Sequence, residues 1–285
     1  MKTLIRVVSV AALAAVVSDL QAQPAALDAF FARFTDEWVR LDPNLAVSTG
    51  YFSGAEQNAL EQQLTPQTLA FKQETLALAK SGLAELQAIN LNEVSENQRV
   101  AANVMQWQLE RVIEWEQYLD YGSTYFNSMY PLQQMDGANV ELVNALTVIH
   151  PLDNKQHADN YLARLQLVDE RMLEAVEEAH RQAGLGILPP AFILAATLEQ
   201  MQDFISKTPA ENPLVTTLFE KTATASDMTE VQRKDMAAQA TVIVEQQLYP
   251  VWQQAIDELQ AQLPLATDEA GISRFANGAD MYASL

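Results

Sequence analysis

The chain has no cysteine and few basic residues, and these two features exclude several kinds of site and partner. Without cysteine it can form no disulfide, offer no thiolate to a metal and carry no lipid on an N-terminal cysteine. Only 17 Lys and Arg stand against 37 Asp and Glu, so the formal net charge is −20. Such a surface repels nucleic acid and anionic lipid, and we expect neither as a partner.

Glycine-dependent motifs are also missing. The nine glycines form no G-x-G-x-x-G or G-x-x-x-x-G-K loop, so nucleotide binding by a standard loop is not expected. No G-x-S-x-G stretch is present to position a nucleophilic serine. The sequence therefore offers neither chemistry in its usual form.

The first residues are typical of a secretory signal peptide. Lys2 and Arg6 precede an apolar run that ends at Val17, and a small residue, Ala22, follows a short polar stretch. The run is about eleven residues long, too short for a bilayer, which takes roughly 20. We predict a cleaved signal peptide at residues 1–22, a periplasmic or secreted product, and no membrane attachment after cleavage.

The remaining chain, residues 23–285, is predicted to form a helical domain. Apolar residues recur at steps of three and four, as in the first mature helix with Leu27, Phe30, Phe34 and Trp38, whereas alternation typical of strands is hard to find. The pattern predicts an all-α fold, a multi-helix array of antiparallel helices.

Capping patterns mark where several helices begin. Thr65-Pro66 resembles an N-cap followed by proline in the first turn. Two capping boxes each predict the start of a long helix: Ser95 with Gln98, and Thr229 with Gln232. Pro250 falls within the second of these helices, where we expect a kink.

The middle of the chain carries one long amphipathic run and one break. Apolar residues from Leu162 to Ala179 predict a continuous stripe, with Glu178 and its acidic neighbours largely on the solvated side. Residues 208–227 contain Pro209 and Pro213 and are the candidate for an irregular linker.

The three histidines are the first candidates for metal ligands. His150 and His157 are seven residues apart, about 10.5 Å along a continuous helix, and Pro151 interrupts that helix. Asp153 and His157 could share a face, but two ligands are fewer than the three protein ligands that zinc requires. His180 suits a helix C-terminus as a favourable cation. We therefore assign no metal ligand.

No catalytic residue is assigned either. General acid or base chemistry needs a buried carboxyl group with a shifted pKa, and no acidic residue stands isolated in a strongly apolar stretch. Neighbouring pairs such as Glu177-Glu178 are expected on any solvated face of so acidic a chain. The four tryptophans are interpreted as packing residues: Trp38, Trp107, Trp115 and Trp252.

Four segments, in order, carry a family resemblance. They are F-x-D-E-W-V-R-L-D-P-N-L-A-V-S-T-G-Y from Phe34, H-P-L-D-N and N-Y-L-A-R-L within 150–165, G-L-G-I-L-P-P at 184–190, and A-G-I-S-R-F-A-N-G-A-D-M-Y-A-S-L at 270–285. Together they resemble the N-terminal half of the bacterial domain of unknown function 885 family. Four residues match family positions: Pro189, Pro190, Gly278 and Tyr282. The resemblance implies structural roles for all four, with substrate contact as the alternative for Tyr282.

The resemblance implies a zinc-dependent peptidase for complete members, whose zinc motif H-E-x-x-P-G-H is absent from this chain. It implies an exported, incomplete half of a larger helical peptidase-like fold that is not catalytic by itself. No cofactor is then expected here, although zinc is implied for complete members, and the partner would be a peptide substrate or the missing C-terminal half. The alternative is a self-contained periplasmic module for binding or scaffolding.

Overall fold

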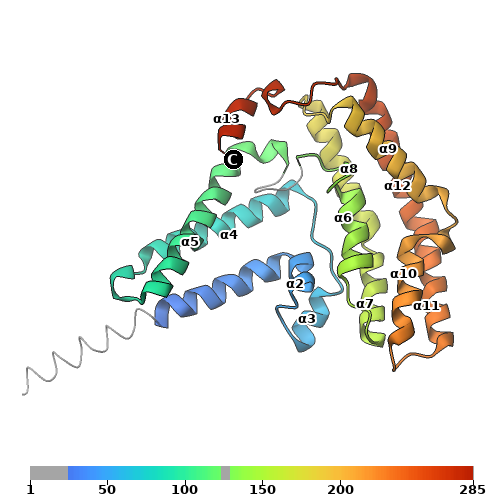
Figure 1. The fold of residues 1–285 in the computed structure, drawn as a ribbon, viewed down its shortest axis with the longest axis horizontal. Helices are drawn as coiled ribbons and strands as arrows, with labels where there is room; N and C mark the ends of the chain where they lie inside the picture. Colours follow the sequence, from blue (N-terminus) through green and yellow to red (C-terminus); the bar gives the residue numbers. More distant parts are fainter. Residues whose placement is uncertain (1–24, 123–128, 285) are drawn as a thin grey trace, which may run out of the picture. The chain divides into compact units, whose positions relative to one another are not determined.

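The computed structural model describes residues 25–122 and 129–284, and in these ranges every regular element is a helix (Figure 1). The predicted all-α array is confirmed. The predicted signal peptide lies outside the described residues. Within those ranges no helix combines the length and the apolarity needed to cross a bilayer. The chain divides into two compact units, and each is taken by itself below.

The first unit contains residues 1–38 and 73–116, described from residue 25. It holds most of the helix at 25–41, most of α4 (Leu69–Ala88), a 3-10 turn (Leu91–Glu93) and α5 (Glu96–Glu114). Its core consists of apolar side chains from all of these helices: Leu27, Phe30, Phe34, Ala79, Leu86, Val94, Ala102, Leu109 and Val112. The predicted capping box at Ser95 is present and begins α5.

An aromatic stack organises this core. The rings of Phe30, Phe34 and Trp38 follow one another at centroid distances of 5.7 and 5.8 Å. Gly82 on α4 lies against the Phe34 ring, and a Cβ at that position would come within 2.1 Å of it. The close approach of helix and ring therefore depends on the missing side chain.

The second unit contains residues 39–72 and 117–285, described apart from 123–128 and 285. Its α-helices are α2 (Pro43–Thr49), α3 (Gly54–Leu60), α6 (Ala138–Asn144), α7 (Lys155–Leu165), α8 (Val168–Gly184), α9 (Ala191–Ser206), α10 (Pro213–Lys221), α11 (Glu230–Ile243), α12 (Tyr249–Gln262) and α13 (Gly278–Ala283). Helix α12 packs against both α8 and α9, and α10 packs against α11. A large apolar core, with Trp252 only 1% exposed, fills the space between these helices.

Two predicted boundaries differ from the structure. The run from Leu162 to Ala179 is two helices, because α7 ends at Leu165 and α8 begins at Val168. Helix α4 begins after Thr68, whose hydroxyl accepts from the Phe71 N–H at 3.1 Å. The predicted cap, Thr65, instead accepts a hydrogen bond from the Asn44 N–H at 3.0 Å. The Thr65 hydroxyl therefore takes part in a tertiary contact and does not cap a helix.

The linker predicted at 208–227 contains helix α10 in its place. Asn212 caps this helix by accepting from the Leu214 N–H at 3.0 Å, and Pro213 occupies the first turn. A proline fits there because the N–H that it lacks would have no partner within the helix. Pro250 likewise lies in the first turn of α12, directly after a π-helical turn (Val244–Leu248) that interrupts the expected α-helix.

The tryptophans only partly follow the packing prediction. Trp252 and Trp115 are buried, and Trp38 packs against the core of the first unit. Trp107 is 52% exposed, so the prediction was wrong for this residue. Helical spacing shows which residues share a face of α5, and Trp107 lies on the face that is exposed to solvent.

Candidate functional site

Two polar features distinguish the second unit: a buried network around Arg164 and His150, and a cavity lined by charged side chains. Arg164, on α7, is fully buried. Its Nε donates to the Gln63 carbonyl at 2.8 Å, and one terminal nitrogen donates to the Asn44 side chain. Burial lowers the pKa of Arg164 to about 10, although the charges of Glu61 and Asp42 raise it. The guanidinium thus stays charged at neutral pH and is held mainly by neutral acceptors.

His150, at the end of the helical turn that follows α6, is held in one tautomer. Its Nε2 lies 2.8 Å from the His157 carbonyl, which can only accept, so Nε2 carries the proton. Its Nδ1 lies 3.5 Å from a terminal nitrogen of Arg164. Burial lowers the pKa of His150 to about 4; the His157 hydrogen bond opposes the shift and Arg164 adds to it. His150 is therefore neutral at pH values near 7.

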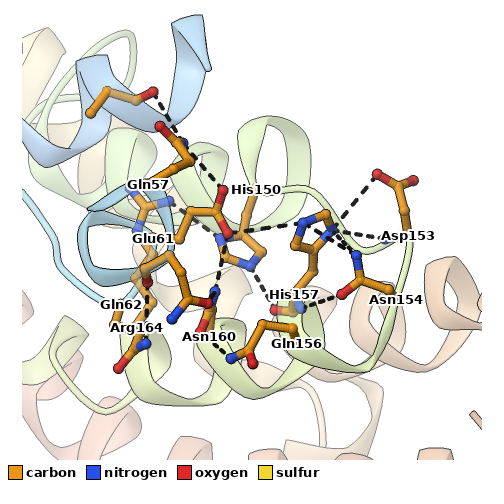
Figure 2. Close-up of polar contacts among 12 residues, drawn as sticks. Gln57, Glu61, Gln62, His150, Asp153, Asn154, Gln156, His157, Asn160 and Arg164 are labelled. Carbon is orange, nitrogen blue, oxygen red and sulfur yellow. Dashed lines mark hydrogen bonds and ion pairs between the residues drawn. The ribbon is translucent and has the colours of Figure 1, made fainter. Parts of the chain in front are cut away.

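Glu61 and Asn160 join α3 to α7 on the other side of this network. The Asn160 amide donates to Glu61 Oε2 at 3.1 Å, and Gln57 donates to Glu61 Oε1 at 3.2 Å. Gln156 in turn donates to Asn160 at 3.1 Å (Figure 2). Both Glu61 and Asn160 are buried, so each polar group is matched by a partner rather than by water.

His157 lies beside two carboxylates. Its Nε2 is 4.0 Å from Glu61 Oε2, and its Nδ1 is 3.7 Å from Asp153 Oδ2. Asp153 is largely exposed, and His150 directs its Nε2–H to the backbone rather than to a shared centre. Across residues 25–122 and 129–284, no three His, Asp or Glu side chains are arranged to share a metal ion. The described residues around His157 therefore do not provide the three protein ligands that a zinc ion needs.

The cavity has a volume of about 360 Å³. Its lining is rich in charged and hydrogen-bonding groups: Asp42, Asn44, Thr65, Gln67, Lys72, Gly122, Tyr130, Pro131, Asp136, Ala138, Glu141 and Glu178. Four of these are carboxylates and one is an ammonium. A volume of this size falls within the range of small-molecule sites, roughly 300–1,000 Å³.

The buried pair of Lys72 and Glu178 forms part of the cavity wall and continues outward through Arg181 to the exposed Asp120. Lys72 Nζ lies 3.2 Å from Glu178 Oε1, and Arg181 Nε lies 2.7 Å from Glu178 Oε2. Arg181 also reaches Asp120 at 2.7 Å. Burial would raise the pKa of Glu178, but Arg181 and Lys72 more than offset this and lower it. Burial lowers the pKa of Lys72, with Glu178 opposing the shift.

Glu178 corrects a prediction made from the sequence. It was placed on the solvated side of its helix, yet it is only 6% exposed. Glu61, which the sequence analysis did not single out, is also only 6% exposed. Arg181, three residues along, was a local signal for Glu178, but Lys72 is 106 residues away and no local pattern indicates it.

The remaining singled-out residues have simple surroundings. His180 is exposed near the end of α8 and lies 3.2 Å from Glu258. Pro190 caps α9, and a Cβ on Gly278 would meet the Ile272 carbonyl oxygen at 1.8 Å, so this position requires glycine. Tyr282 is 69% exposed.

Comparison with known proteins gives a family and a fold. The family described as "Bacterial protein of unknown function (DUF885)" matches residues 43–285. The crystal structure of "the putative lipoprotein from Colwellia psychrerythraea" is similar with a TM-score of 0.73 at 16% identity, over 89% of this chain. The chain spans 45% of the length of that protein. No curated protein matches.

Proposed function

Because the chain belongs to the DUF885 family, we propose that it is the exported, helical N-terminal portion of a zinc-peptidase-like protein and does not hydrolyse peptides by itself. The observation that carries this proposal is the environment of His157, where two carboxylates and an imidazole approach without forming a set of metal ligands. The absence of H-E-x-x-P-G-H from the sequence supports it. So does a structural relative of more than twice the matched length.

Export is the second part of the proposal. The basic start, the short apolar run and the small residue at position 22 support cleavage by a signal peptidase. The similar structure is described as a lipoprotein, which also belongs to the exported class. Since this sequence has no cysteine to lipidate, we place the processed chain free in the periplasm or outside the cell.

Zinc content and peptidase activity of the purified chain test the proposal. After incubation with excess zinc and dialysis, we expect no stoichiometric zinc by elemental analysis and no cleavage of denatured casein. Zinc-dependent cleavage that is lost in His157→Ala but kept in His180→Ala would overturn it. His180 is the matched control because it is exposed and lies apart from the buried network.

A second candidate is a self-contained periplasmic binding or scaffolding module. The observation that favours it is the cavity, whose described lining comes entirely from one compact unit. Thermal melting with a dye for exposed apolar surface separates the two candidates. One sharp transition with little dye binding before it favours the module. A broad transition with early dye binding favours the portion of a larger protein.

A further inference from the structure

We infer that the cavity lined by Lys72, Glu141 and Glu178 binds a small zwitterion, a molecule that carries both a primary ammonium group and a carboxylate. The inference goes beyond the proposed function, because binding here needs neither zinc nor any further chain. It rests on the cavity and on unused hydrogen-bonding capacity at both of its charged walls.

Asp136 and Glu141 form the acidic wall of the cavity, and no side chain that the structure describes makes an ion pair with either of them. Asp136 and Glu141 lie close enough for the Asp136 charge to add to the effect of burial, and together they raise the pKa of Glu141. Among the described residues, Asp136 accepts a side-chain hydrogen bond from the neutral Gln133 alone, and no side chain donates to Glu141. A ligand ammonium placed here would relieve the repulsion between the two carboxylates.

Lys72 forms the basic wall of the cavity, and not all of its N–H donors are used. An ammonium group has three N–H donors, and Lys72 directs one of them to Glu178. Glu178 is already held by two nitrogens of Arg181, at 2.7 and 3.0 Å. The Lys72 side chain is only 17% exposed, so few water molecules can accept from its remaining N–H groups. A ligand carboxylate would provide these acceptors.

The balance of charges selects between ligands. The lining carries four carboxylates, those of Asp42, Asp136, Glu141 and Glu178, against the single charge of Lys72. A simple acid would meet this excess of negative charge, while a simple amine would leave the Lys72 N–H donors that do not reach Glu178 without an acceptor. A zwitterion satisfies both walls, and a volume of about 360 Å³ suits a molecule of dipeptide size.

Calorimetric titration of the full chain with the dipeptide alanyl-alanine tests this inference. We expect saturable binding, and binding weaker by about tenfold when either end of the dipeptide is blocked, by N-acetylation or by C-terminal amidation. No saturable heat from the free dipeptide would overturn the inference. Equal binding of the doubly blocked dipeptide would overturn it as well, because that molecule carries no charge.

Two variants assign the walls. Lys72→Met should lower the affinity for the free dipeptide by about tenfold, and C-terminal amidation should then cause no further loss. Glu141→Gln should lower the affinity by a similar factor and remove the effect of N-acetylation. Lys234→Met and Glu220→Gln are controls away from the cavity and should bind as the unmodified chain does. Glu141 is a rim residue whose loss should spare folding, so unchanged binding in Glu141→Gln would contradict the inference even if Lys72→Met folded poorly. Zinc content is unaffected by either result, which keeps this test separate from that of the proposed function.

Discussion

The two compact units of this chain bury different kinds of side chain. In the first unit the buried residues are apolar, with an aromatic stack at the centre. Among the residues that the structure describes, every buried polar or charged side chain belongs to the second unit: Glu61, Thr65, Asn139, His150, Asn160, Arg164, Glu178, Gln182, Thr197, Asn212, Thr222 and Gln262. The first unit is therefore held by packing, and the second by packing together with a polar network.

Ion pairs show the same contrast. In the first unit Lys80 and Glu116 pair at 2.7 Å with both side chains about half exposed, where water weakens the attraction. In the second unit Lys72 and Glu178 pair at 3.2 Å with side chains 17% and 6% exposed. Buried polar groups tolerate few geometries, because each unmatched donor or acceptor costs free energy. Within the second unit, directional polar contacts therefore orient residues 39–72 on residues 117–284, in addition to the burial of apolar surface.

The largest expected effect comes from breaking the core of the first unit. Phe34→Ala removes a buried ring between two aromatic neighbours and should cost about 3–5 kcal/mol of unfolding free energy. Trp38, Trp107 and Trp115 belong to the first unit and Trp252 to the second, so urea unfolding followed by tryptophan fluorescence in a Trp252→Phe background reports the first unit. Val104→Ala, an exposed control on α5 of the same unit, should change stability by less than about 0.5 kcal/mol. Equal costs would contradict the assigned core.

The next largest effect comes from the network of the second unit. Arg164→Met keeps much of the side-chain volume but leaves the Gln63 carbonyl without its donor, and should cost about 3 kcal/mol. Arg164→Lys should not restore stability, since an ammonium lacks the planar fork that reaches several acceptors at once. Urea unfolding measures both variants, with exposed Arg99→Met as the control. A loss below about 1 kcal/mol would mean that apolar packing alone holds this unit.

A pH titration of stability sharpens the comparison further. The unfolded His150 takes up a proton near pH 6.5, whereas the folded one does so only at about 4, so between these values the unfolded state binds more protons. The contribution is fully present above pH 6.5 and is lost as the pH falls toward 4. Between pH 7 and 5 we expect a loss of about 2 kcal/mol from this residue.

Two histidine variants check the source of that loss. His150→Gln should flatten the pH dependence of the unfolding free energy over this range, and His180→Gln should leave it as it is. The His180 side chain is 78% exposed and lies outside the buried network. The same slope in all three proteins would assign the pH dependence to other groups.

The smallest effect is expected at the surface of the first unit. Lys80→Gln removes the exposed pair with Glu116 and should cost about 0.5 kcal/mol or less, because solvent screens the attraction and the free side chains regain entropy. Added salt should narrow the difference from the unmodified chain. A cost as large as that of Arg164→Met would remove the contrast between the two units.

Much of the fold could be predicted from local signals. The capping boxes at Ser95 and Thr229 begin helices as expected, because the bonds that they make lie within four residues. Thr65 was misassigned because its hydroxyl bonds to a residue 21 positions away. The candidate site fared worse for the same reason: Glu178 meets Lys72 across 106 residues, and Arg164 meets Gln63 across 101.

Composition alone gives the acidic surface and the absence of thiol chemistry. The all-α class and most helix starts also follow from the sequence, because contacts between near neighbours decide them. Only the tertiary structure decided which charges are buried. An acidic residue on a helix is written the same way whether it faces water or a lysine from a distant segment. Glu178 and Glu61 became buried groups, and the cavity acquired two charged walls, because the chain folded residues 39–72 onto the helices that follow residue 117.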